Sequence, residues 1–168
     1  MTQLGTITPV NKEQEEYRLK LRDVVILHKA WCLVVSGTFG NGKTYIAKAA
    51  VNSTKDIGSH YTTQPNIQIE LRSGNSDYYK YLCNVPVLVI DEMSDRTTDW
   101  TDFIKTNIEN ILIERHSHLR STVIIGNVDA DRFVAMFDAR VRDRLKEGLS
   151  MIMNGDSLRR AYAEKQSV

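Results

Sequence analysis

The sequence predicts an α/β fold in which a parallel sheet is covered by helices on both faces. Three short segments are apolar almost throughout, and segments of helical periodicity separate them: "WCLVVSG", "VPVLVIDEM" and "STVIIGN". Strands of this kind are buried on both faces, and the helices between them supply the crossovers that parallel strands need. The length of 168 residues, with 42% hydrophobic and 26% charged side chains, matches one globular domain.

The first half of the chain is expected to contain four helical regions and two strands. A helix over about residues 12–28 has apolar positions at mostly helical spacing and a charged opposite face. A buried strand at 31–36 leads through a glycine-rich turn into a helix from about Tyr45. A short strand near 60–62 then precedes a helix that opens at Pro65, and after the turn "SGNSD" a further helical piece covers "DYYKYLCN".

The second half continues the alternation with a strand at 87–90, a helix, and a strand at 122–126. One side of that helix carries Trp100, Ile104, Ile108, Ile111 and Arg115. A helix from about Asp129, another over "DARVRDRLKEG" and a last strand, "LSMIMNG", complete the pattern. We expect the strand at 31–36 to lie between the other two long strands.

The glycine-rich turn "GTFGNGKT" fits the pattern G-x-x-x-x-G-K-[ST], and it lies between a strand and a helix as that pattern requires. Its glycines let successive backbone N–H groups point at a phosphate, and the helix N-terminus adds partial positive charge. Lys43 would reach the β- and γ-phosphates of ATP, and the Thr44 hydroxyl would bind Mg²⁺. The alternative, a turn with a solvated lysine, fits this context less well. The expected ATP-binding residues are Gly37, Thr38, Phe39, Gly40, Asn41, Gly42, Lys43, Thr44 and Tyr45.

Polar residues also follow the two later strands. Asp91 and Glu92 end "VLVIDE", where the first carboxylate would hold Mg²⁺ and the second would orient or deprotonate a water. An acidic pair can also simply cap a loop, but a phosphate loop upstream favours the metal site. Asn127 ends "STVIIGN"; a lone asparagine there is often a turn residue, yet beside Asp91 it could contact the attacking water or the γ-phosphate.

Taken together, these segments resemble the AAA+ ATPase domain of DnaC-type helicase loaders, with the IstB transposition helpers as close relatives. The likeness covers about residues 33–160 and includes "IENILIERH", "TVIIGNVD", "ARVRDRL" and "GDSLRR". It implies that Asn127 is sensor 1, Arg144 the arginine finger with Arg140 one turn earlier, and Arg159 sensor 2. The residues alone leave open that these arginines are surface charges.

The resemblance also implies an AAA+ P-loop core with a five-stranded parallel sheet and no separate C-terminal lid domain. The expected organisation is an N-terminal extension and helix at 1–30, the ATPase core at 31–160 and a tail at 161–168. The implied partners are a replicative helicase, single-stranded DNA, and a second copy of the chain through an arginine-finger interface.

Composition limits the possible ligands and the cellular location of the protein. Twenty-two Lys+Arg against 21 Asp+Glu leave a net charge of +1, so contact with nucleic acid would need a local patch. Cys32 and Cys83 lie in or beside apolar runs, which indicates reduced thiols and a cytoplasmic protein. No apolar run approaches the roughly 20 residues that span a bilayer, and the N-terminus lacks the pattern of an export signal, so no membrane association is expected.

The favoured function is therefore an ATPase that acts in DNA replication as a helicase loader, with weak hydrolysis unless it assembles. An IstB-like transposition helper and a nucleotide-gated adaptor with little hydrolysis remain alternatives. A small P-loop kinase is less favoured, because Glu92 beside Asp91 suits water as the acceptor and the terminal arginines follow a strand rather than lie in a lid loop.

Overall fold

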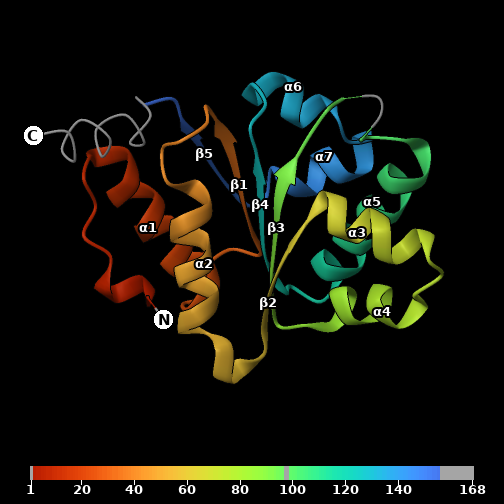
Figure 1. Ribbon diagram of the computed structural model, residues 1–168, viewed down its shortest axis with the longest axis horizontal. Coiled ribbons are helices and arrows are strands. Elements are labelled where there is room, and N and C mark those ends of the chain that lie inside the picture. Colours follow the sequence, from red (N-terminus) through yellow and green to blue (C-terminus); the bar gives the residue numbers. More distant parts are fainter. Residues whose placement is uncertain (1, 97–98, 156–168) are drawn as a thin grey trace, which may run out of the picture.

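A computed structural model describes residues 2–96 and 99–155 and contains one five-stranded sheet (Figure 1). The strands are β1 (Cys32–Gly37), β2 (Ser59–Thr63), β3 (Val87–Met93), β4 (Ser121–Gly126) and β5 (Leu149–Met153). They pair in the order β2-β3-β4-β1-β5, and every pair is parallel. The predicted α/β class with a five-stranded parallel sheet is confirmed.

Helices cover both faces of this sheet. They are α1 (Lys12–Val25), α2 (Lys43–Ser53), α3 (Gln64–Arg72), α4 (Ser76–Asn84), α5 (Asp102–Ser117), α6 (Ala130–Ala135) and α7 (Ala139–Leu145), with 3₁₀ turns at η1 (Leu4–Thr6) and η2 (Lys55–Ile57). Figure 1 shows α1 and α2 on one face and α3 to α7 on the other. Among the described residues, none of these helices is both long and apolar enough to cross a membrane.

Six of the helices begin at a residue whose side chain accepts a hydrogen bond from a backbone N–H group of the first turn; for example, Asn11 caps α1 and Asp138 caps α7. Helix α2 differs, because its N-cap is Gly42, which has a φ of 92° and no side chain to bond these groups. The first backbone N–H groups of α2 are therefore not capped by a side chain.

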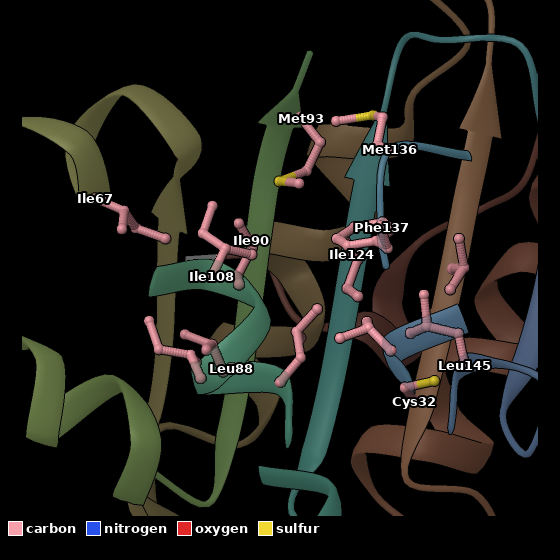
Figure 2. Close-up of a cluster of buried hydrophobic side chains, with 14 of the residues drawn as sticks. Cys32, Ile67, Leu88, Ile90, Met93, Ile108, Ile124, Met136, Phe137 and Leu145 are labelled. Carbon is pink, nitrogen blue, oxygen red and sulfur yellow. The ribbon is translucent and has the colours of Figure 1, made fainter. Parts of the chain in front are cut away.

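Alternate residues of each strand enter two separate cores. In β1, Leu33 and Val35 pack toward α1 and α2, whereas Cys32 and Val34 pack toward the other layer. Figure 2 shows this second core, in which Leu88 and Ile90 of β3 and Ile124 of β4 face Ile108 of α5. Burial on both faces explains why the strands read as unbroken apolar runs.

The strand order differs from the one expected from the sequence. The sequence predicted that β1 would lie between β3 and β4, but β4 lies between β3 and β1. β1 itself lies between β4 and β5. Because all the long strands are apolar on both faces, their composition does not distinguish one neighbour from another. The consequence for the site is that the ends of β1 and β3 are two strand spacings apart, about 9–10 Å, with the end of β4 between them.

Within residues 2–96 and 99–155, no helix or strand follows β5, and these residues include no separate lid domain. Cys32 and Cys83 are free and buried, in keeping with the expected reduced thiols.

Candidate functional site

The glycine-rich loop leaves β1 at Gly37, where the backbone runs against the end of β5. Gly37 has a φ of 129°, and a Cβ atom there would lie 2.1 Å from the Met153 carbonyl oxygen. The next residue, Thr38, donates its N–H to the same oxygen at 3.0 Å. Only glycine fits at Gly37, because both the backbone conformation and the close approach exclude a side chain.

Lys43, at the start of α2, is a buried cation with only 4% of its surface exposed. Its Nζ donates to the Gly37 carbonyl at 3.1 Å, to the Asn41 side-chain oxygen at 3.0 Å, and to the Thr38 carbonyl. Burial lowers the pKa of Lys43 to about 8, and the charge of Asp91 opposes this shift only in part. Because these three acceptors are neutral, a phosphate oxygen would be a stronger partner for this ammonium group.

Thr44 and Asp91 meet although they come from α2 and β3. The Thr44 hydroxyl donates to Asp91 Oδ2 at 2.7 Å, and the backbone N–H of Glu92 donates to Oδ1 at 2.7 Å. Asp91 is 1% exposed, whereas Thr44 is exposed. A hydroxyl and a carboxylate at this distance offer the hard oxygen ligands that Mg²⁺ prefers, so these side chains fit the metal that ATP carries.

Glu92 differs from Asp91 in backbone conformation and in exposure to the cavity. The pairing of β3 with β4 shifts register between Ile90 and Met93, and Glu92 adopts a φ of 58°. A left-handed conformation is uncommon for a residue other than glycine and is found at functional sites more often than elsewhere. Here Glu92 is exposed and lines the same cavity as Lys43, while Asp91 stays buried.

That cavity has a volume of about 1010 Å³, which is at the large end of the range for small-molecule sites. Of the residues predicted from sequence, it is lined by Phe39, Gly40, Asn41, Gly42, Lys43, Thr44, Tyr45, Glu92 and Asn127. Asn127, at the end of β4, lies between the ends of β1 and β3. The inserted strand thus brings a neutral amide to the gap that separates the loop from the acidic pair.

Sequence analysis missed a second set of lining residues. They are Lys48, Pro65, Met93, Ser94, Asp95, Arg96, Asp99, Val128 and Arg132. Lys48 could have been found, because it lies four residues after Thr44 and therefore on the same face of α2. Arg132 had no local signal: its guanidinium reaches across from α6 to pair with Asp95 in the loop after β3.

One buried side chain holds that loop in place. Gln64, which is buried at the start of α3, donates to the Asp99 carbonyl at 2.9 Å and accepts from the Ser94 N–H at 2.8 Å. The NH₂ group and the oxygen of the Gln64 side-chain amide therefore both bond the loop after β3 and hold it against the start of α3.

Arg140 and Arg144, which the resemblance implied for the arginine finger, do not line this cavity in the same chain. Arg144 donates to the Arg140 carbonyl at 2.9 Å, and its own carbonyl accepts from Nε1 of Trp31 at 3.0 Å, beside the amino end of β1. Arg140 pairs with Asp138 at 3.1 Å. Arg159 lies outside the described residues, so its predicted role remains a prediction.

The parallel sheet in the order β2-β3-β4-β1-β5, with the glycine-rich loop between β1 and α2, is a P-loop fold. Among solved structures the chain is similar to that of the DnaC helicase loader, with a TM-score of 0.74 and 23% identity over 91% of this chain and 97% of that one. It is similar to DnaI, with a TM-score of 0.75 and 19% identity over 93% and 89%. Comparison with AMPPCP-bound DnaA from Aquifex aeolicus gives a TM-score of 0.71 and 14% identity over 99% of this chain but only 56% of DnaA.

No model of a protein family matches the sequence, and no curated protein matches it. At these identities the structural likeness shows the fold, and it confirms the expected fold of a DnaC-type AAA+ domain.

Proposed function

We propose that this chain binds ATP with Mg²⁺, hydrolyses it to ADP and phosphate, and acts in DNA replication as a helicase loader or as the ATPase domain of one. The observation that carries the proposal is the cavity itself. It combines a buried Lys43 whose acceptors are all neutral, a Thr44 hydroxyl 2.7 Å from Asp91, and an exposed Glu92.

Binding would begin with an exchange of partners at Lys43. The ammonium group leaves the carbonyls of its own loop for the β- and γ-phosphate oxygens, and the uncapped N–H groups at the start of α2 bond the same phosphates. Thr44 and Asp91 would hold Mg²⁺, which offsets phosphate charge when bound. Each of these contacts is stronger with a trianionic or tetra-anionic tail than with a neutral ligand.

Hydrolysis would use the two polar groups that face the cavity from the ends of β3 and β4. Glu92 accepts a proton from the attacking water, and the water oxygen forms the new bond to the γ-phosphorus while ADP leaves. Asn127 donates a hydrogen bond to the γ-phosphate or orients the water. Both side chains line the cavity, in keeping with these roles.

The proposed place in replication is supported by the likeness to the DnaC helicase loader, of which the matched region covers 97%. We infer a replicative helicase as the partner and a cytoplasmic location. Single-stranded DNA is a further proposed ligand, since one of the similar structures is a DnaA bound to AMPPCP and single-stranded DNA. The proposed organisation remains an extension at 1–30, the core at 31–160 and a tail at 161–168.

Titration with fluorescent ATP tests the binding role, and an assay of phosphate release tests hydrolysis separately. We expect Lys43→Ala to lose ATP binding, and Glu92→Gln to bind ATP but release no phosphate. Lys146→Ala is the matched control, because its ammonium group is exposed and lies outside the cavity. Equal ATP affinity for Lys43→Ala and the wild type would overturn the phosphate-cradle assignment. Binding without phosphate release by the wild type, even at high concentration, would leave a nucleotide-gated adaptor instead.

We further propose that Arg144 completes the site of a neighbouring copy, because it does not line the cavity of its own chain. Loss of an arginine finger costs roughly 10³ to 10⁵ in rate. A mixture of Glu92→Gln and Arg144→Ala should then hydrolyse ATP faster than the sum of the two variants, since some interfaces combine a competent cavity with an intact arginine. Arg142→Ala, on the same helix, is the control. It keeps both Glu92 and Arg144, so by itself it should hydrolyse ATP as the wild type does. No recovery in mixtures shown by light scattering to co-assemble would refute a role in trans.

The partner is tested with purified components. Glu92→Gln holds ATP without turnover, so it should co-sediment with the replicative helicase in ATP and release it in ADP. Equal co-sedimentation in both nucleotides, or none in either, would refute the loader role while leaving the ATPase intact.

A further inference from the structure

We propose that Tyr61 is a positioning residue for Asp91, which holds the carboxylate in the orientation needed to bind the metal of the nucleotide. This inference rests on the proposed function. Tyr61 lies on β2, the edge strand next to β3, and belongs to neither the glycine-rich loop nor the acidic pair.

Strand register brings Tyr61 to the correct face of the sheet. Tyr61 is paired with Val89, and Thr63 with Asp91. Since side chains two residues apart along a strand point to the same face, Val89, Asp91 and Tyr61 share the face that α1 and α2 cover. From there the Tyr61 hydroxyl donates to Asp91 Oδ2 at 2.8 Å.

Both oxygens of Asp91 are thereby oriented by donors from different segments. Oδ2 accepts from Thr44 on α2 and from Tyr61 on β2, while Oδ1 accepts from the N–H of Glu92 on β3. Thr44 would itself turn to the metal when nucleotide binds. Tyr61 is then the side chain that still bonds Oδ2 while the Glu92 N–H bonds Oδ1, and the two donors together resist rotation of the carboxylate about its Cβ–Cγ bond.

The aromatic ring of Tyr61 is held independently of its hydroxyl. Lys48 Nζ lies 4.8 Å from the ring centroid, and the half-buried ring packs against the core under α1 and α2. Lys48 is one turn beyond Thr44 on α2, so the same helix positions one metal ligand and braces the tyrosine that orients the other. A phenylalanine would keep the packing and the contact with Lys48 and would lose only the bond to Asp91.

The phenol is suited to act only as a donor here. A phenol keeps its proton at physiological pH, so the Tyr61 hydroxyl can donate to Asp91 Oδ2. The bond from Tyr61 to a carboxylate is charge-assisted and therefore stronger than one between neutral groups.

The test compares wild type and Tyr61→Phe in two titrations. Fluorescent ATP in the presence of a chelator measures nucleotide binding without metal, and Mn²⁺ titration of the ATP complex, followed by electron paramagnetic resonance, measures the metal. We expect metal-free ATP affinity to stay within about twofold and Mn²⁺ affinity to fall about tenfold, because one hydrogen bond to a charged group is lost. Tyr81→Phe, at an exposed tyrosine of α4, is the control and should change neither.

The outcomes separate the inference from the function beneath it. Unchanged Mn²⁺ affinity in Tyr61→Phe, or an equal loss of ATP affinity with and without metal, would overturn the positioning role while ATP binding stands. Failure of the wild type to bind Mn²⁺ and ATP together would overturn the proposed function and this inference with it.

Discussion

Lys43 and Arg115 are both buried cations, but they lie at different ends of the same sheet and use their burial differently. Lys43 is 4% exposed at the carboxyl edge of the strands, and Arg115 is fully buried near the amino ends of β3 and β4. Neither bonds a carboxylate within residues 2–96 and 99–155. Burial lowers the pKa of both, to about 8 for Lys43 and about 9 for Arg115.

Their acceptors decide what each cation does. Arg115 donates to the Val85 carbonyl at 2.7 Å, the Ser121 carbonyl at 2.7 Å, the Leu82 carbonyl at 2.8 Å and the Thr122 hydroxyl at 2.8 Å. It therefore joins the end of α4 and the starts of β3 and β4. Within the described part of the chain, Lys43 bonds only groups of its own loop, and it faces a cavity.

The difference teaches that a buried cation without an acid is not by itself a functional residue. Arg115 cannot leave its acceptors without stranding buried carbonyls from three segments, each of which would cost free energy. Lys43 can leave its acceptors, because a ligand that enters the cavity offers a better partner and the loop amide of Asn41 stays bonded to Met153.

The largest expected effect is a loss of stability when Arg115, the structural cation, is replaced. Arg115→Met should lower the free energy of unfolding by about 3–5 kcal/mol, since it leaves several buried acceptors without donors. Urea denaturation measures the loss. Arg120→Met is the matched control, because Arg120 bonds a single carbonyl of the same region, that of Cys83 at 3.0 Å, and should cost about 1 kcal/mol. A loss below that of the control would remove the distinction between the two cations.

Lys43→Met should produce the opposite pattern. We expect the free energy of unfolding to change by less than about 1 kcal/mol, because water in the adjoining cavity can take the place of the ammonium group at the loop acceptors, whereas the acceptors of Arg115 are buried. The affinity for ATP should fall by about 2–3 kcal/mol, since a charge-assisted contact to phosphate is lost. Denaturation and ATP titration of the same sample check both values. A large loss of stability with intact ATP binding would make Lys43 a second structural cation.

Asn41→Ala sharpens the comparison by removing one acceptor of Lys43 and the tie from the loop to β5. The Met153 carbonyl keeps its bond from the Thr38 N–H, so we expect a loss of only about 1 kcal/mol in unfolding free energy. ATP affinity should fall less than in Lys43→Met. Loss of affinity equal to that of Lys43→Met would show that the amide, and not the ammonium group, organises the loop.

The smallest expected effect lies outside both cations and provides a reference. The N–H of Val141 and, less strongly, Arg140 lower the pKa of Asp138, which caps α7. A carboxyl group whose pKa is lowered by folding stabilises the protein at pH values above its ordinary pKa. That stabilisation is lost as the pH falls through the lowered pKa. Below about pH 4, wild type should therefore lose a few tenths of a kcal/mol relative to Asp138→Asn. Parallel acid titrations followed by circular dichroism would show no divergence if the cap did not depend on charge.

Local patterns in the sequence determined a large part of this protein. Unbroken apolar runs predicted the buried parallel strands, the glycine spacing predicted the loop at Gly37, and helical periodicity placed Arg115 on the inner side of α5, where it is fully buried. These features depend on neighbours within a few turns of the chain, so residue spacing is enough to find them.

Tertiary structure alone decided how the segments meet. The insertion of β4 between β1 and β3, the left-handed turn at Glu92, and the contacts of Tyr61 with Asp91 and of Arg132 with Asp95 have no local pattern. Apolar strands can pair with several neighbours at similar local cost, and the choice among them depends on packing of the whole sheet against both helical layers. Side chains that act through such long-range pairing become visible only when strand order and register are known.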